Sequence, residues 1–208
     1  MEYGIYGIVS SFVSTSIFYP IDTLKTRRQA FGTFRPLKFN SLYKGITPEL
    51  LSCAPSSFIY WWTYQKCREN NFSTTESSLL SCLTSNLIDT PFDIKKKRYQ
   101  LNSFSNLEKV LPKYCLGNVL SSIVYNLFYI NTLKKCKEKD GINNYLCITC
   151  ASSISAFMSY PLDRWKTNLI MPSNTTYLKG LGLRLLHANL YSGLYMSIFL
   201  WLSNNKLI

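Results

Sequence analysis

A proline followed by an acid and a base recurs three times in this chain at nearly equal spacing. The copies begin at Pro20, Pro91 and Pro161, which are 71 and 70 residues apart. In each copy an aspartate stands two residues after the proline and a lysine five residues after it. The resulting acid and base pairs are Asp22 and Lys25, Asp93 and Lys96, and Asp163 and Lys166. Opposite charges form charge-assisted hydrogen bonds, and a fixed period indicates a repeated structural unit. The motif therefore predicts three equivalent units that meet through their charges.

We expect the aspartate of each unit to pair with a lysine of another unit. The expected pairs are Asp22 with Lys96, Asp93 with Lys166, and Asp163 with Lys25. Such a ring closes one end of a central cavity. Each partly exposed pair contributes only about 0–1 kcal/mol, whereas a ligand bound at millimolar to micromolar affinity contributes roughly 4–8 kcal/mol. Ligand binding can therefore open the ring. The alternative, ordinary charges at helix ends, explains one copy better than three.

Long stretches without charge predict the elements that carry the motif. Four stretches of 19 to 21 residues contain no Asp, Glu, Lys or Arg: 3–21, 114–133, 142–162 and 185–205. About 20 such residues span the hydrocarbon core of a bilayer. Two shorter stretches, 50–65 and 77–88, raise the expected number of crossings to six. Their many Ser, Thr, Asn and Tyr residues predict a polar interior rather than full contact with lipid. A soluble helical bundle is the alternative, but it does not need charge-free runs of this length.

We therefore expect an all-α membrane protein in which six transmembrane helices form three two-helix repeats. The repeats are expected over residues 1–70, 71–140 and 141–208. In each repeat a helix kinked by its proline is followed by a basic connection and a second helix. The second helix of repeat two begins near Leu111 or near Gly117, and the sequence leaves both starts open.

The net charge of +12 is concentrated in the connections within the repeats. Residues 22–49, 89–113 and 163–184 hold 16 of the 23 lysines and arginines. This bias predicts that these connections lie on the inner side of the membrane, near anionic lipid head groups. Because the bases belong to a motif at the ends of the spans, we expect no nucleic-acid partner.

The remaining chemistry-bearing residues give no sign of an enzyme. Seven cysteines are an odd number without framework spacing, and Cys147-x-x-Cys150 has no second pair or neighbouring histidine. We therefore expect free thiols, no metal site and no cofactor. A phosphate-cradling glycine loop and a nucleophile beside a base are also absent from the sequence, so no catalytic residue is expected.

The three motif copies resemble the signature of the mitochondrial carrier family, P-x-[DE]-x-x-[KR] in three repeats. The matching residues are Pro20, Asp22, Lys25, Arg27, Pro91, Asp93, Lys96, Arg98, Pro161, Asp163 and Lys166. The resemblance implies a monomeric six-helix barrel with pseudo-threefold symmetry. It also implies that the barrel lies in the inner membrane of a mitochondrion or of a reduced mitochondrion-related organelle and moves a small solute by alternating access. The glutamine braces of the family match Gln29 and Gln100. Asn168 and Ile170 replace the third-repeat base and brace, which implies a weaker network there.

Other family elements are present in part. The chain is shorter than is usual for the family, mainly in the connections within the repeats. The family's cardiolipin-binding element is matched by Tyr43-Lys44-Gly45 and by Lys179-Gly180, which implies contact of Lys44, Gly45, Lys179 and Gly180 with anionic lipid. On the opposite side, Tyr64-Gln65-x-x-Arg68 lacks the acid of the family's second motif. The resemblance therefore implies no second gate built from salt bridges.

The resemblance also implies where the solute binds. Its contact points on the second helices fall on Ser52, on Val124 and Tyr125, and on His187, while Arg184 matches a gate-side arginine. The segments YPIDTLKTRRQ, SCAPSSFIYW and YPLDRWKTNLIM resemble those of the S-adenosylmethionine carriers, and this resemblance implies import of that solute. An arginine and a glutamate of those carriers are replaced at Val124 and Tyr125. An iron, nucleotide or other small-solute carrier, and a membrane scaffold that has lost transport, therefore remain open.

Overall fold

The computed structural model forms six long helices, with no strand in the residues that it describes. These residues are 2–32, 39–102, 107–137, 143–172 and 178–203. The long helices are α1 (Glu2–Phe31), α3 (Ile46–Glu69), α4 (Thr74–Leu101), α5 (Leu107–Lys137), α6 (Asn144–Ile170) and α7 (Leu181–Leu202). A four-residue helix, α2 (Phe39–Leu42), lies between α1 and α3.

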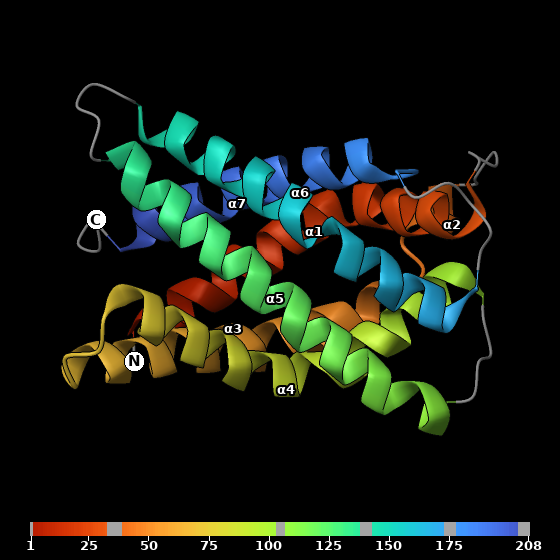
Figure 1. Cartoon of the computed structure of the whole chain (residues 1–208), viewed down its shortest axis with the longest axis horizontal. Coiled ribbons are helices and arrows are strands. Elements are labelled where there is room, and N and C mark those ends of the chain that lie inside the picture. The colour runs from red at the N-terminus through yellow and green to blue at the C-terminus, as the bar shows by residue number, and fades with distance from the viewer. Residues whose placement is uncertain (1, 33–38, 103–106, 138–142, 173–177, 204–208) are drawn as a thin grey trace.

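The six long helices form a closed ring. Each contacts the next along the chain, and α7 returns to contact α1. The start of α1 and the end of α7 therefore lie at the same end of the bundle, as Figure 1 shows. The helices α1, α4 and α6, which carry the three motif copies, also touch one another. The expected all-α barrel of six helices is confirmed.

The motif lies within continuous helices. Helices α1, α4 and α6 run through Pro20, Pro91 and Pro161, although each proline removes one backbone hydrogen bond. Each acid and base therefore lie three residues apart on one helix face. The kinks expected at these prolines stay a prediction.

Helix α5 begins earlier than either start that the sequence left open. It begins at Leu107, ahead of Leu111, and Gly117 lies inside it. Helices α3 and α7 begin instead after glycines with positive φ, Gly45 and Gly180. Gly117 does not have a positive φ, so the helix continues through it toward the N-terminus. The predicted start near Gly117 was wrong for this reason, and the predicted start near Leu111 lies about one turn too late.

The division into three repeats stays a prediction. The expected boundary after residue 70 falls in the turn between α3 and α4. The boundary between residues 140 and 141 lies outside the described residues.

The bundle is polar inside and apolar outside. Serines such as Ser14, Ser81 and Ser155 are fully buried, whereas Leu87 and Trp201 on the outer surface are 75% and 78% exposed. Buried serines also bond within their own helices; Ser81 Oγ, for example, donates to the Ser77 carbonyl oxygen at 2.7 Å. This arrangement is the one expected of helices that face lipid and surround a polar interior.

Three helices are apolar enough over a long enough stretch to cross a membrane by length and composition alone. Among the described residues these are α1, α6 and α7. Helices α3, α4 and α5 have 24, 28 and 31 residues, so they are also long enough to cross, but their sequences are more polar. Their polar side chains face the interior of the ring, as Ser52, Ser81 and Ser121 do.

Candidate solute cavity and motif cluster

The three motif copies meet in one place. We call Asp22, Lys25, Asp93, Lys96, Asp163 and Lys166 the motif cluster; each is at most 9% exposed. They come together because α1, α4 and α6 contact one another at this level of the ring. Six buried charges held this close are stable only when paired.

The ion pairs of the motif cluster differ in part from the expected ring. Lys96 Nζ lies 3.2 Å from Asp22 Oδ2, which is the expected contact between repeats one and two. Lys25 and Lys166 instead approach the aspartates of their own helices, at 2.6 Å from Asp22 and 3.5 Å from Asp163. Among the described residues, Asp93 and Lys166 form no ion pair, and neither do Asp163 and Lys25. The i, i+3 spacing explains the change, because it places each acid beside its own base.

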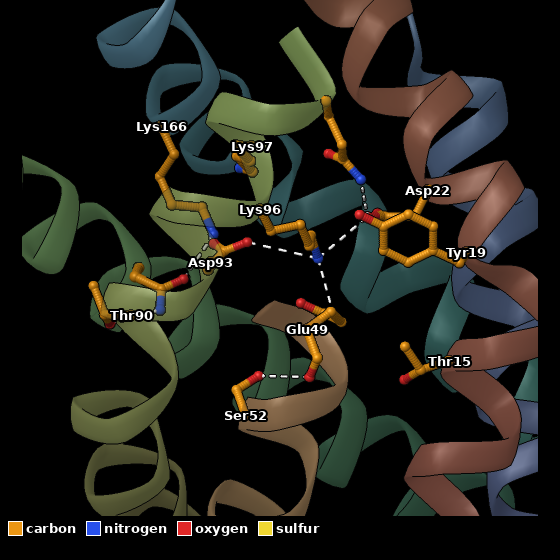
Figure 2. Close-up of polar contacts among 12 residues, drawn as sticks. Thr15, Tyr19, Asp22, Glu49, Ser52, Thr90, Asp93, Lys96, Lys97 and Lys166 are labelled. Carbon is orange, nitrogen blue, oxygen red and sulfur yellow. Dashed lines mark hydrogen bonds and ion pairs between the residues drawn. The ribbon is translucent and has the colours of Figure 1, made fainter. Parts of the chain in front are cut away.

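Lys96 is the centre of the motif cluster. Figure 2 shows its ammonium between carboxylates from three helices, Asp22 of α1, Glu49 of α3 and Asp93 of α4. The contact with Glu49 Oε1 is the shortest, at 2.9 Å. Sequence reasoning missed Glu49, because it belongs to no motif. The available signal was an acid in the first turn of a predicted span.

Asp163 is held from two other helices. Arg184 Nη1 of α7 lies 2.8 Å from Asp163 Oδ2, and Arg184 Nη2 donates to Ser159 Oγ at 2.8 Å. Lys97 Nζ of α4 lies 3.9 Å from Asp163 Oδ1 and 5.3 Å from the centre of the Tyr114 ring. The predicted gate-side arginine therefore contacts the motif cluster directly.

Each aspartate of the motif cluster also accepts a hydrogen bond from an uncharged side chain. Gln100 Nε2 donates to Asp22 at 3.2 Å, and Gln29 Nε2 donates to Asp163 at 3.3 Å. Asp93 has no glutamine partner among the described residues, but Tyr114 Oη donates to it at 2.6 Å. Tyr114 is fully buried and packs with Ile170 in an apolar cluster. Tyr114 therefore donates a hydrogen bond to the aspartate of repeat two, as the two glutamines donate to the other two aspartates.

Arginines tie the repeats together through backbone carbonyls. Arg27 Nε of α1 donates to the Gln100 carbonyl oxygen at 2.8 Å. Arg164 of α6 donates from Nη1 to the Gln29 carbonyl oxygen. Position 168 holds an asparagine where the other two repeats have an arginine. Arg164, four residues earlier on the same helix, supplies a base in its place. The expectation of a weaker third-repeat network did not include these contacts of Arg164 and Tyr114, and it stays a prediction.

A cavity of about 520 Å³ extends from the level above the motif cluster to the end of the ring where α4 and α6 begin. Eight aromatic rings line it, with polar and aliphatic side chains between them. We call it the aromatic chamber, and its rings are Tyr60, Trp61, Tyr64, Tyr125, Tyr129, Tyr191, Tyr195 and Phe199. They come from α3, α5 and α7, the second helices of the three repeats. A volume of this size is within the range of roughly 300–1,000 Å³ that is typical of small-molecule sites.

Known proteins are similar to this chain in sequence. The family model described as mitochondrial carrier protein matches residues 1–75. The S-adenosylmethionine mitochondrial carrier protein homolog of Drosophila melanogaster is 26% identical over 79% of this chain and 71% of its own length. The mitochondrial thiamine pyrophosphate carrier 1 of Candida albicans is 32% identical over 62% of this chain and 51% of its own length.

A third relative is the mitochondrial RNA-splicing protein MRS3 of Saccharomyces cerevisiae, which is 23% identical over 83% of this chain and 69% of its own length. The matches to these relatives thus extend well beyond residues 1–75. The chain is therefore similar to the mitochondrial carrier family.

The predicted solute contacts of this chain lie at different levels of the ring. Tyr125 lines the aromatic chamber, and His187 stacks on Tyr191 at 5.7 Å. Ser52 is buried lower down, where its hydroxyl donates to the Glu49 carbonyl oxygen at 2.9 Å. Val124 does not line the chamber. Whether any of them contacts a solute stays a prediction.

The candidate lipid elements of repeats one and three share one geometry. Gly45 and Gly180 precede α3 and α7 with φ of 85° and 96°, a conformation that suits glycine. Tyr19 Oη donates to the Lys44 carbonyl oxygen at 2.9 Å, and Tyr160 Oη donates to the Lys179 carbonyl oxygen at 2.6 Å. In repeats one and three, the tyrosine before the motif proline therefore holds the start of the next helix by a hydrogen bond.

The cysteines are free thiols in this structure. All seven are unpaired, including buried Cys147 and exposed Cys150. Among the described residues, no three His, Cys, Asp or Glu side chains are grouped so that they could hold a metal ion.

Proposed function

We propose that this chain is a solute carrier of the mitochondrial carrier family, in the inner mitochondrial membrane or in the membrane of a reduced mitochondrion-related organelle, that imports S-adenosylmethionine. The observation that supports transport is a buried ion cluster across one end of a cavity that reaches the other end of the ring. In this proposal the motif cluster is the matrix-side gate. Alternating access requires such a gate to close and open in turn.

The energetics of the motif cluster suit a gate. Its contacts join α1, α3, α4, α6 and α7, so separating the helices breaks several contacts together. Solute binding at micromolar affinity contributes about 8 kcal/mol, which is enough to break a few buried pairs that are replaced by water. A solute acts on the gate only through a difference in its affinity for the two states.

The choice of S-adenosylmethionine rests on relatives and on local sequence. The Drosophila relative is named for that solute, and the segments around Pro20, Pro55 and Pro161 resemble carriers of it. The Candida relative is named for thiamine pyrophosphate, so the solute is decided by experiment.

Uptake into liposomes tests the proposal. Purified protein is reconstituted, and uptake of radiolabelled S-adenosylmethionine is measured with and without the same compound inside. We expect saturable uptake that is faster than in empty liposomes. The exposed pair of Lys66 and Glu69 offers a matched control, and Glu69→Gln is expected to transport normally. Uptake equal to that of empty liposomes, with no thermal shift by the compound, would refute the choice of solute.

We also propose that anionic lipid binds where α3 and α7 begin. After Gly45 and Gly180 the two helices present their N-terminal ends, whose positive dipole is suited to a phosphate group. Cardiolipin is expected to raise the unfolding temperature in detergent. The increase should be smaller in Gly180→Ala, while Gly182→Ala, whose added methyl meets nothing within 4 Å, should keep it.

A further inference from the structure

We propose that the solute of the aromatic chamber carries a fixed positive charge beside a planar heteroaromatic ring, and that Asp89 binds the charged part. The inference rests on the proposed function in one respect, namely that a solute enters this cavity. It goes further because it names the chemistry of recognition and a residue that no motif contains.

Stacked aromatic rings line the chamber on two helices. On α7 the rings of Tyr191, Tyr195 and Phe199 follow one another at 6.0 and 6.2 Å, with interplanar angles of 16° and 13°. On α5 the rings of Tyr125 and Tyr129 lie 5.9 Å apart at 14°. Aromatic rings attract both cations and other planar rings. Aromatic walls on two helices therefore favour a solute that has both a positive charge and a planar ring.

The chamber is nearly free of charged side chains in the part of the chain that the structure describes. Among the described residues that line it, Lys134 alone is charged, and its Nζ lies 3.1 Å from Thr75 Oγ1 near the mouth. Arg184 and Lys166, deeper in the ring, contact Asp163. Among the described residues, the chamber wall thus holds a single base, Lys134 near the mouth, and no arginine that could pair with an anionic solute deeper inside.

Asp89 is an acidic residue beside the aromatic chamber. It lines a pocket of about 180 Å³ that adjoins the chamber, since Ser57, Tyr60 and Tyr195 line both. Among the described residues no base lies within ion-pair distance of Asp89, whereas Glu49 contacts Lys96. Asp89 is therefore a carboxylate beside the cavity whose charge is not neutralised by an ion pair.

The sequence indicates that Asp89 is not part of the threefold machinery. It stands two residues before Pro91, and the corresponding positions before Pro20 and Pro161 hold Phe18 and Ser159. A residue needed only to join the repeats would be expected in all three. An acid in one repeat alone fits an asymmetric ligand.

Binding by purified protein in detergent tests the inference with two matched compounds. S-adenosylhomocysteine has the ring and amino acid of S-adenosylmethionine but lacks one methyl group and the sulfonium charge. We expect the natural protein to bind S-adenosylmethionine about tenfold more tightly, as one cation–π contact and one carboxylate contact allow. In Asp89→Asn the ratio should fall severalfold, mainly through loss of affinity for the cation, and the aromatic rings should retain the remaining preference. Glu69→Gln, the same change at an exposed site, should keep the tenfold ratio.

The outcomes separate this inference from the proposed function. If S-adenosylmethionine is transported but the ratio is near one, or is unchanged in Asp89→Asn, the inference is wrong and the function stands. If S-adenosylmethionine is not bound but thiamine, another cation on a heteroaromatic ring, binds and loses affinity in Asp89→Asn, the inference stands and the choice of solute is wrong. Preference for adenosine or adenosine monophosphate, or binding of none of these compounds, overturns the inference. The ratio in the natural protein tests the charge requirement even if Asp89→Asn fails to fold.

Discussion

Replacement of Lys96 by alanine is the sharpest test of how the motif cluster is held together. Lys96 contacts Glu49, Asp22 and Asp93 at 2.9, 3.2 and 3.6 Å. Removing one partner of a buried ion pair costs about 3–5 kcal/mol, because the other charge is left buried and unpaired. For a chain of this size such a loss lowers the unfolding temperature by about 6–20 °C. The change is measured by intrinsic tryptophan fluorescence during heating in detergent.

The structure predicts which second substitution restores stability to Lys96→Ala. Lys25 remains 2.6 Å from Asp22 in this variant, whereas Glu49 loses the one ion-pair partner that it has among the described residues. Glu49→Gln in the Lys96→Ala background should therefore recover a substantial part of the lost unfolding temperature. Asp22→Asn in the same background should recover none, because it leaves Lys25 without its carboxylate. Greater recovery with Asp22→Asn than with Glu49→Gln would refute this account of the cluster.

Two further substitutions test other parts of the structure. Tyr114→Phe removes the hydroxyl that donates to Asp93 at 2.6 Å and keeps the buried ring, so the free energy of unfolding should fall by about 1–3 kcal/mol. The control Tyr99→Phe, at a residue that is 59% exposed, should change the free energy of unfolding little. Equal effects of the two substitutions would contradict the role given to Tyr114. Gly180→Ala forces a side chain into φ of 96° and brings its methyl within 2.9 Å of Gln29 Cγ. It should destabilise the protein by about 1–2 kcal/mol, measured by thermal unfolding, whereas Gly182→Ala should not.

Much of the fold was predictable from the sequence because it depends on period and polarity. Three motif copies about 70 residues apart predict three equivalent units, and long charge-free stretches predict helices that cross a membrane. The spacing of Asp and Lys on one helix face follows directly. The contact between Asp22 and Lys96 was also predictable, because equivalent positions of neighbouring repeats meet in a ring. The start of α5 was not, because repeat two lacks the positive-φ glycine that precedes α3 and α7.

The sequence by itself determined which positions are equivalent, and only the tertiary structure decided which unlike residues complete the site. Glu49, Arg164 and Tyr114 belong to no repeated pattern, yet each contacts a motif residue or its brace. Asp89 is likewise outside the pattern and lies beside the cavity. The reason is that a period records what three units share. The contacts that differ between them depend on which side chains reach across helix interfaces, and those are set by the packing of helices far apart in the chain.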